Sequence, residues 1–442
     1  MSRYLINGGR PLHGEVSIRG AKNAGFKQVI ASLLSEETTH LTNVPNITDI
    51  HITQSIAESL GSNFVKIGPH GFEISTPKIT SSVVPQGTGE KSRSSFMFAG
   101  PLLARTGEAT IPIPGGDKLG ARPLDRLFEC YHQMNIKVEE SASKIHFSTT
   151  GIRGTVYKFE KPSHTVTEVL LMTCSVAQGE SVLHNAALEP EIDDLIEMLN
   201  SMGAKITRDP VDPKIIRIKG VPFLNGAHHQ VIADRNETIT FACAALSTRG
   251  SINILRIEPK IIETFLRTIE TMGAHVDRGR DEVSITWTSP LKAIDIETEP
   301  EPGFMTDWQG IFSLVMTQAI GCSSVIERIF PSRFQHIETL NQMGAKTKLF
   351  NPEVADPSSY YHFNPESDLP SYFHGVKIYG PCKLQPVNIT VKDLRAGALA
   401  TLAALTAQGE SVIEGVEYIE RGYEKLAERL MALGADIKYI KT

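Results

Sequence analysis

A glycine-rich segment in the first third of the chain carries two adjacent charged residues. The segment Gly115–Gly120 reads GGDKLG, with glycines on both sides of Asp117 and Lys118. Glycine adopts backbone conformations that other residues avoid, and it lets the chain approach a ligand closely. The pattern therefore predicts a loop that closes over a bound ligand and carries Asp117 at its tip.

Three other polar residues have both a chemical and an ordinary structural interpretation. Thr306-Asp307 is typical of a helix N-cap, although a carboxylate can also act as a general base. Asn23 follows a lysine and is typical of a turn, although its amide can hydrogen-bond a ligand. His164 is an isolated histidine, which is typical of a polar surface and is also able to contact a bound ligand. The residues alone leave these alternatives open.

The cysteines give no sign of a metal site or of disulfide bonds. Five are scattered through the chain, without a C-x-x-C pair and without a histidine at a spacing suited to zinc. An odd number of cysteines does not suggest a disulfide framework. We predict that all five are buried thiols and that the protein uses no metal and no cofactor.

One short pattern recurs along the chain and divides it into repeated units. Leucine or methionine, then glycine, then alanine or serine closes five predicted helices, beginning at Leu60, Met202, Met272, Met343 and Leu433. Met134-Asn135-Ile136 is a degenerate sixth copy. The copies are about 70 residues apart, and the last interval is longer because it contains a Pro/Ser/Tyr-rich insertion at about 351–373.

Each repeat has the same predicted order of elements. A glycine ends one helix in the left-handed conformation, a short β-branched strand follows, and an amphipathic helix runs to the next glycine. The sequence therefore predicts an α/β fold of six repeats. A solenoid would need polar repeats at its two ends, and the ends here are no more polar than the rest. Closure into two domains of three repeats is favoured.

Length and composition agree with a two-domain globular protein. A chain of 442 residues exceeds one compact core, and 41% hydrophobic with 21% charged residues is ordinary globular composition. A net charge of -6 argues against a nucleic-acid or anionic-membrane surface protein. The first residues lack the apolar core of a signal peptide, and no apolar run is long enough to span a membrane, so a cytoplasmic protein is expected.

Five further segments are distributed over essentially the whole chain, beginning at Ile18 (IRGAKNA), Pro114 (PGGDKLGARPLD), Thr306 (TDWQ), Asp393 (DLRA) and Arg421 (RGYE). They resemble, in the same order, the signatures of the UDP-N-acetylglucosamine 1-carboxyvinyltransferases. The resemblance implies a two-domain inside-out α/β barrel, the EPSP synthase-like fold, with three βαβαββ-type repeats in each domain. It also implies one domain of residues 22–231 with a mobile loop at 113–122, and a second domain of residues 1–21 and 232–442 that carries the insertion.

The resemblance implies transfer of the enolpyruvyl group from phosphoenolpyruvate to the 3-hydroxyl of UDP-N-acetylglucosamine, with release of phosphate by addition and elimination. It also implies a role in peptidoglycan synthesis, and through it in cell wall biogenesis, cell shape, the cell cycle and cell division. The expected protein is a cytoplasmic monomer or weak homo-oligomer. Transfer to another nucleoside or sugar, and a catalytically silent paralogue that binds a nucleotide sugar, are the alternatives.

The same resemblance assigns the site residues. The catalytic residues would be Asp117 in the acid position, Asp307 as the base or hydroxyl-orienting group, and Lys22. Phosphoenolpyruvate would contact Lys22, Asn23, Arg122, Arg333, Arg395 and Arg421, because arginine pairs bidentately with carboxylates and phosphates. The UDP-sugar would contact Asn23, Arg93, Arg122, Pro123, Leu124, Asp125, Arg126, Lys161, Ser163, His164, Thr165, Asp307 and Ile329.

Two positions depart from the family's usual sequence. Most members have cysteine where this chain has Asp117, and a carboxylate is a far weaker nucleophile than a thiolate. Resistance to the epoxide antibiotic fosfomycin is therefore expected. His164-Thr165 replaces a common Val-Gly after Ser163, so the nucleotide pocket is expected to differ in detail.

Overall fold

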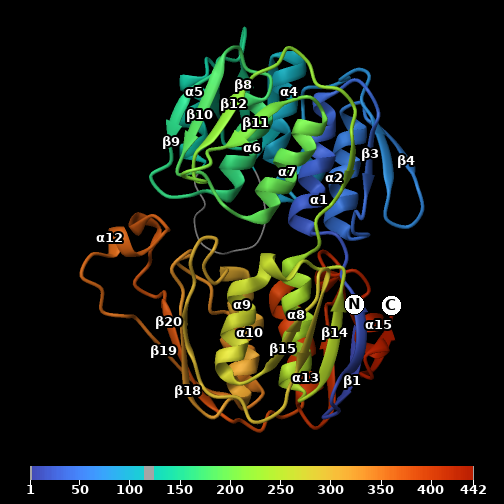
Figure 1. Ribbon diagram of the computed structural model, residues 1–442, viewed down its shortest axis with the longest axis vertical. Coiled ribbons are helices and arrows are strands. Elements are labelled where there is room, and N and C mark those ends of the chain that lie inside the picture. The colour runs from blue at the N-terminus through green and yellow to red at the C-terminus, as the bar shows by residue number, and fades with distance from the viewer. Residues whose placement is uncertain (1, 114–123, 442) are drawn as a thin grey trace. The chain divides into compact units, whose positions relative to one another are not determined.

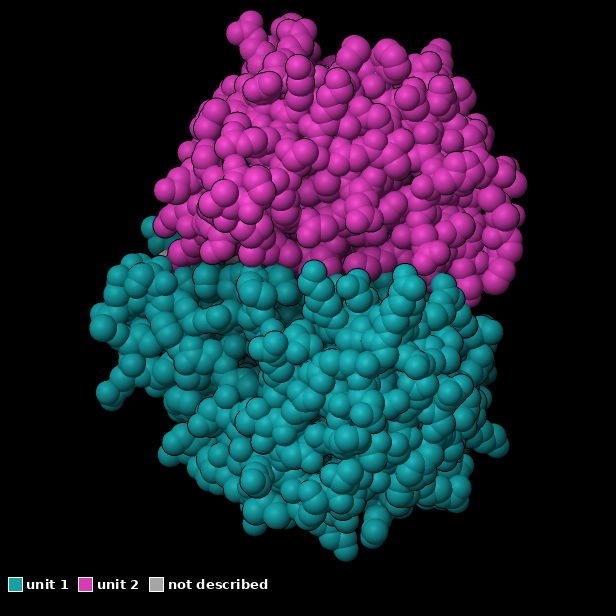
Figure 2. Space-filling view, in the orientation of Figure 1, with its two compact units in different colours: residues 1–19, 118–121, 233–442 teal, residues 20–117, 122–232 magenta. Residues whose placement is uncertain are grey.

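The computed structural model describes residues 2–113 and 124–441 (Figure 1). These residues form two compact units, which are coloured separately in Figure 2. Unit 1 holds the described residues up to Arg19 and from Ala233 onward, and unit 2 holds those from Gly20 to Ile232. No helix of the described part is long and apolar enough to cross a membrane.

The described strands form six small sheets, three in each unit, and the sheets share one topology. An outer strand runs parallel to its neighbour, and two further strands pair antiparallel, as in the order β9, β10, β12, β11. The sheet β6-β8-β7 has an isolated parallel bridge between Val83 and Thr110 in place of the outer strand. Six sheets of one topology confirm the six repeats predicted from the sequence.

The strands of unit 2 have the following bounds: β3 (Thr39–Thr42), β4 (Asn63–Lys66), β5 (Phe72–Ser75), β6 (Glu108–Pro112), β7 (Lys137–Glu140), β8 (Lys144–Ser148), β9 (Val156–Lys158), β10 (Glu180–His184), β11 (Lys205–Arg208), β12 (Ile216–Lys219) and β13 (His228–Gln230). Those of unit 1 are β1 (Arg3–Gly8), β2 (His13–Ser17), β14 (Ser251–Leu255), β15 (His275–Arg278), β16 (Glu282–Thr286), β17 (Asp295–Glu297), β18 (Gly321–Ile326), β19 (Lys346–Phe350), β20 (Gly375–Gly380), β21 (Asn388–Thr390), β22 (Gly409–Glu414) and β23 (Asp436–Ile440).

Three helices lie at the centre of each unit, and the sheets lie outside them (Figure 1). In unit 1 these are α8 (Arg235–Ser247), α10 (Thr306–Gln318) and α13 (Leu394–Thr406), which contact one another. All 13 residues of α8 are buried, as expected of a helix that is largely apolar around its circumference. In unit 2 the corresponding helices are α1 (Lys22–Ala31), α4 (Ala99–Thr106) and α6 (His164–Cys174). Helices inside and sheets outside are the arrangement of the predicted inside-out α/β barrel.

The remaining longer helices are amphipathic, with one buried face. In α9 (Glu263–Met272) the buried residues are Phe265, Leu266, Ile269 and Met272, which form one helical face. The strands alternate instead, as in Ile216 and Ile218 of β12, so one face of each sheet is buried. The others in this group are α2 (Thr48–Ser59), α5 (Asp125–Gln133), α7 (Pro190–Ser201), α11 (His336–Gln342) and α15 (Leu426–Ala432).

The glycines of the recurring pattern end helices in the predicted conformation. Gly273 follows α9 with φ 104°, in the left-handed region that glycine adopts without a steric penalty. In the degenerate copy Asn135 takes this place with φ 64°, which is tolerable because asparagine enters this region more readily than most residues. The other four glycines, Gly61, Gly203, Gly344 and Gly434, also have positive φ.

The insertion at 351–373 lies between β19 and β20 and contains the short helix α12 (Pro357–Tyr360). Its rings pack on one another, with the centroids of Tyr361 and Phe363 4.8 Å apart in a stacked arrangement. Arg328 follows β18, and its guanidinium lies 4.3 Å from the centre of the Tyr360 ring. Aromatic and cation–π contacts therefore attach the insertion to its unit.

Replacing Leu266 by alanine should destabilise unit 1. Leu266 is fully buried on α9, and removing its side chain leaves a cavity, so the free energy of unfolding should fall by about 2–5 kcal/mol. Urea denaturation followed by circular dichroism measures this. Leu369→Ala is the matched control, because Leu369 is 51% exposed in the insertion. Equal losses in the two variants would contradict the assigned core.

Candidate active site

In unit 1 the carboxylate of Asp307 is held by two arginines. Arg333 Nη2 donates to Asp307 Oδ1, and Arg395 Nη2 donates to Oδ2 at 3.3 Å. The N-cap of α10 is Met305, and no side chain caps the helix, so the capping interpretation of Asp307 is wrong. Two charge-assisted hydrogen bonds hold the carboxylate in one orientation at the first turn of a buried helix.

Arg395 is held in turn by Tyr423. Arg395 Nη1 donates to the Tyr423 hydroxyl at 2.9 Å, and that hydroxyl lies 2.8 Å from Thr240 Oγ1 on α8. Burial would lower the pKa of Arg395, but Tyr423 and the charges of Asp307 and Asp234 outweigh it and raise the pKa. Arg395 is therefore a firmly charged group in a fixed position.

Glu327 is a buried carboxylate that the sequence did not single out. It accepts hydrogen bonds from Thr306 Oγ1 at 2.8 Å, from the Ile329 N–H at 2.8 Å and from the Phe330 N–H at 3.0 Å. It thereby ties the start of α10 to the segment that leads to Arg333. Burial raises its pKa, in opposition to the Arg333 charge and to these hydrogen bonds. Only the fold joins these segments, so no local sequence pattern indicates this role.

Two further residues predicted for unit 1 lie close to this group in sequence. Arg421 is partly exposed and stands two residues before Tyr423, after the short helix α14 (Val416–Ile419). Ile329 is partly exposed and is fixed through its backbone by Glu327. Asp307, Arg333 and Arg395 are thus brought together directly, and Ile329 is connected to them through Glu327.

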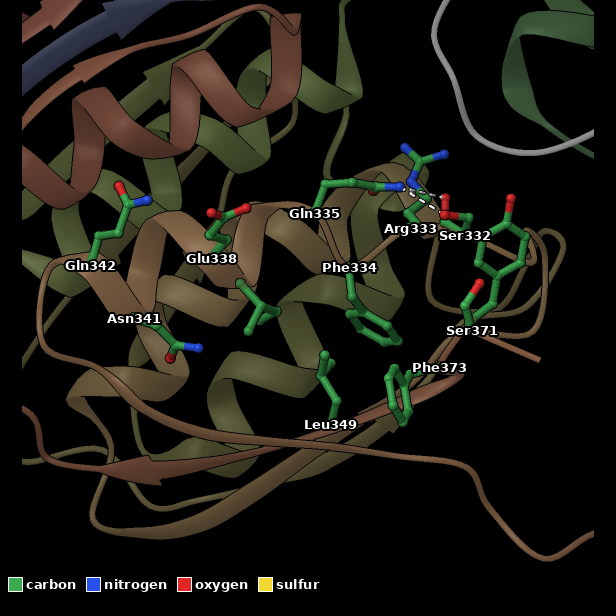
Figure 3. Close-up of a pocket in the computed structure, with 12 residues that line it drawn as sticks. Ser332, Arg333, Phe334, Gln335, Glu338, Asn341, Gln342, Leu349, Ser371 and Phe373 are labelled. Atoms are coloured by element: carbon green, nitrogen blue, oxygen red, sulfur yellow. Dashed lines mark hydrogen bonds between the residues drawn. The ribbon is translucent and has the colours of Figure 1, made fainter. Parts of the chain in front are cut away.

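A cavity of about 640 Å³ adjoins Arg333, between α11 and the insertion (Figure 3). Figure 3 shows Phe334, Leu349 and Phe373 grouped together, with the Arg333 guanidinium away from them. Gln335 Nε2 donates to the Ser332 hydroxyl at 2.9 Å at the rim. Among the described residues that were predicted to act in the site, only Arg333 lines this cavity.

In unit 2 Lys22 and Asn23 begin the central helix α1. Lys22 Nζ lies 2.7 Å from Asp49 Oδ2, and Asp49 stands in the first turn of α2. The Lys22 side chain is 18% exposed, whereas that of Asp49 is 6% exposed. The ion pair fixes the lysine with part of its surface accessible. Asn23, the next residue, is also partly exposed.

A second group in unit 2 joins α5 to the segment before α6. Leu124 precedes α5, and Asp125 and Arg126 form its first turn. Arg126 Nη1 donates to the backbone carbonyl of Lys161 at 3.0 Å. The structure thus brings together two segments that the sequence assigned separately to the nucleotide pocket.

The third group in unit 2 is the start of α6. Ser163 caps this helix by accepting a hydrogen bond from the Val166 N–H at 3.4 Å, and His164 and Thr165 form its first turn. His164 is not an ordinary surface residue, because its Nε2 lies 2.9 Å from Glu168 Oε1 and 3.1 Å from Lys27 Nζ. Lys27 belongs to α1, so this contact joins the helix that begins with Lys22 to the helix that begins with His164.

Of the remaining predicted site residues, the structure describes Arg93 but not the others. Arg93 opens the helical turn η2 (Arg93–Phe98), and burial lowers its pKa. Asp117, Arg122 and Pro123 lie outside the described residues.

The described residues contain no group of three or more His, Cys, Asp or Glu that could hold a metal ion. The prediction of five buried thiols is wrong at Cys322, which is exposed because it stands at the start of β18 before the strand enters the core.

A family model described as EPSP synthase (3-phosphoshikimate 1-carboxyvinyltransferase) matches residues 6–430. The chain therefore belongs to the EPSP synthase family. Its fold is similar to that of the enolpyruvyl transferase NikO from Streptomyces tendae, with a TM-score of 0.84, 22% identity and coverage of 100% of this chain and 99% of that one. An EPSP synthase from Acinetobacter baumannii aligns with a TM-score of 0.73 at 17% identity, over 100% of both chains.

Curated relatives define the branch of the family. A UDP-N-acetylglucosamine 1-carboxyvinyltransferase of Granulibacter bethesdensis is 36% identical over 100% of both chains. UDP-N-acetylglucosamine 1-carboxyvinyltransferase 1 of Carboxydothermus hydrogenoformans is also 36% identical, over 100% of this chain and 99% of its own. Within the EPSP synthase family, the chain is a member of the UDP-N-acetylglucosamine 1-carboxyvinyltransferases.

The stability of unit 1 should depend on pH through His336, which lies three residues after Arg333. Burial lowers the pKa of His336 from 6.5 to about 4. The unfolded chain then binds this proton more readily, so the stabilisation is present above pH 6.5 and is lost as the pH falls toward 4. The loss should reach about 3 kcal/mol at full protonation.

His336→Gln should remove this part of the pH dependence, measured by urea denaturation at a series of pH values between 4 and 7. The control is His13→Gln, because His13 is exposed on β2. If the free energy of unfolding of the His336→Gln protein depended on pH as steeply as that of the wild type, the conclusion that His336 is buried in its neutral form would be wrong.

Proposed function

We propose that this protein transfers the enolpyruvyl group of phosphoenolpyruvate to the 3-hydroxyl of UDP-N-acetylglucosamine and releases phosphate. Its full-length relationship to proteins with the corresponding name supports this activity. The reaction would supply peptidoglycan synthesis, and through it cell wall biogenesis, cell shape, the cell cycle and cell division. We expect the enzyme to act in the cytoplasm as a monomer or weak homo-oligomer.

The reaction proceeds by addition and then elimination. The sugar oxygen bonds to C2 of phosphoenolpyruvate while C3 gains a proton, which gives a tetrahedral intermediate. The bond from C2 to the phosphate oxygen then breaks, C3 loses a proton, and the double bond forms again. The first step needs an acid for C3 and a base for the hydroxyl, and both steps need cations that bind the phosphate and the carboxylate.

The observation that carries the proposal is the position of Asp307 between Arg333 and Arg395. In the proposed roles, the two arginines bind the carboxylate of phosphoenolpyruvate, and Asp307 orients or deprotonates the hydroxyl. A base must lie within hydrogen-bond reach of the proton that it takes, so placing it beside the cations that hold the electrophile suits the addition step.

The other assigned residues complete the proposal. Lys22, Arg122 and Arg421 would bind the phosphate, and Asn23 would hydrogen-bond the sugar or the intermediate. Arg93, the segment from Arg122 to Arg126, the segment from Lys161 to Thr165, and Ile329 would hold the UDP group. Residues 22–231 and residues 1–21 with 232–442 would be the two domains.

The activity is tested by incubating the protein with phosphoenolpyruvate and UDP-N-acetylglucosamine and measuring phosphate release. Asp307→Asn should lower kcat by about 100-fold or more, because the neutral amide cannot accept the proton. Asp281→Asn should leave the rate unchanged, because Asp281 is 75% exposed. Uridine and UDP-galactosamine derivatives serve as alternative acceptors. No release with any acceptor would refute an enzymatic role.

Asp117 should make the enzyme insensitive to fosfomycin. A carboxylate has an ordinary pKa of about 3.9 and is ionised at neutral pH, so Asp117 can donate a proton only if the closed complex excludes water and holds substrate anions nearby. We propose that it is competent as an acid only in that closed complex. Its weak nucleophilicity should prevent attack on the epoxide.

The test compares the wild-type protein with Asp117→Cys by mass spectrometry after incubation with fosfomycin. The cysteine variant should gain a covalent adduct and lose activity with time, whereas the wild-type protein should do neither. Labelling of wild-type Asp117 would refute the idea, as would equal sensitivity of the two proteins.

A further inference from the structure

Lys27, Glu168 and His164 form a charged cluster inside unit 2. Glu168 Oε1 accepts a hydrogen bond from Lys27 Nζ and lies 2.9 Å from His164 Nε2. The side chains of Glu168 and Lys27 are 0% and 4% exposed, whereas that of His164 is 22% exposed. Of the three side chains, only the His164 imidazole is therefore appreciably accessible to solvent, and it contacts the buried pair of Lys27 and Glu168.

The partners of Nε2 restrict the protonation state of His164. Lys27 can only donate, so a neutral ring accepts from it at Nε2 and carries its proton on Nδ1. A charged ring carries protons on both nitrogens and donates from Nε2 to Glu168. The third state, neutral with its proton on Nε2, donates to Glu168 as the charged ring does, but it brings no positive charge to the carboxylate and offers Lys27 no acceptor. Both favoured states leave Nδ1 as a donor.

Three charged groups set the balance between the neutral and the charged ring. Burial would lower the pKa of His164, but the charge and hydrogen bond of Glu168 outweigh it and raise the pKa. Lys27 from α1 opposes this, and Glu189, which precedes α7, adds to it. The positive end of the α6 dipole also disfavours a cation here but favours a nearby anion.

Glu168 can accept hydrogen bonds that the cluster does not provide. Its second oxygen, Oε2, is buried and has no hydrogen-bond partner in the described part of the chain. A buried carboxylate that lacks a partner on one oxygen gains from a second positive charge nearby. Protonation of His164 supplies that charge without adding a ligand.

We propose that Lys27 and Glu168 are positioning residues that hold the His164 imidazole with its Nδ1–H directed to a phosphate oxygen of the nucleotide sugar. The inference rests on the proposed function, because it takes its anion from the UDP group of that acceptor. It goes beyond that function because Lys27 and Glu168, which were not predicted site residues, would control the tautomer and the charge of His164. Binding of the nucleotide sugar should then weaken as His164 loses its charge.

The first experiment is independent of activity. The His164 imidazole is titrated by proton NMR in the free protein, and its signal is assigned by its absence in His164→Gln. Glu168→Gln should lower the titration midpoint by about one pH unit, because it removes the stabilising charge and leaves Lys27 in place. Lys27→Met should raise the midpoint by a similar amount. Shifts in the same direction, or no shifts, would overturn the proposal.

The second experiment measures KM and kcat against pH with each substrate varied. The KM for UDP-N-acetylglucosamine should rise about tenfold above the His164 midpoint, with kcat and the KM for phosphoenolpyruvate little changed, because a charge-assisted hydrogen bond is lost. His164→Gln should abolish this dependence, and Glu168→Gln and Lys27→Met should move it in opposite directions. His132→Gln is the control, because His132 is exposed on α5.

The two experiments separate failure of the inference from failure of the proposed function. Phosphate release with an unchanged pH dependence of KM in His164→Gln would refute the inference alone. A change confined to the KM for phosphoenolpyruvate would also refute it, because the anion would then belong to the other substrate. Without phosphate release from any acceptor the proposed function fails, and the inference, which takes its anion from that acceptor, fails with it.

Discussion

The centre of each unit consists of helices that are buried along nearly their whole length, and this burial dictates where polar chemistry can occur. A helix such as α8, with all 13 residues buried, has no side open to solvent on which charged groups can stand. The ends of such helices still need polar partners, because their first N–H groups have none within the helix. Lys22, His164, Asp307 and Arg395 all stand in the first turn of a central helix. The fold thus concentrates its reactive groups at one kind of position.

Charged groups at these positions are partly buried, so each one needs a partner. Lys22 is paired with Asp49, Asp307 with two arginines, and His164 with Glu168. A buried ion pair contributes little net stability, because desolvation offsets much of the attraction, but loss of one partner is costly. The pairs therefore fix orientation more than they stabilise the fold. Orientation is what a proton transfer or an anion-binding site needs from the residues around it.

The sequence was sufficient for the repeats, because they depend on local signals. A glycine after a helix and alternation along a strand are visible in short windows, and even Asn135 in the degenerate copy has the left-handed conformation that its position predicts. Local signals misled at Cys322, where a cysteine was expected to be buried. The first two residues of β18, Gly321 and Cys322, are exposed, and composition does not show where a strand enters the core.

The partners of the site residues could not be predicted, because they depend on contacts between distant parts of the chain. Lys27 and Glu168 are separated by 141 residues, and Arg395 and Asp307 by 88. Asp307 resembled a helix cap in isolation, and only the structure shows that the N-cap of α10 is Met305 and that Asp307 is held by Arg333 and Arg395. Glu327 carried no local signal. Resemblance to a family supplied the identity of the main groups, and the structure supplied what holds them.

The first strand of the chain pairs with its last elements. β1 lies between β22 and β23, in antiparallel register with both. During synthesis on the ribosome, unit 2 has all of its sequence once residue 232 has emerged, whereas β1 must wait for its partners until almost the end of translation. Unit 2 can therefore fold first, and the amino-terminal strand stays unpaired until the carboxyl end is released. Removing β23 by truncation would leave β1 paired on one side only, with β22, so the first strand of the chain would become the exposed edge of its sheet.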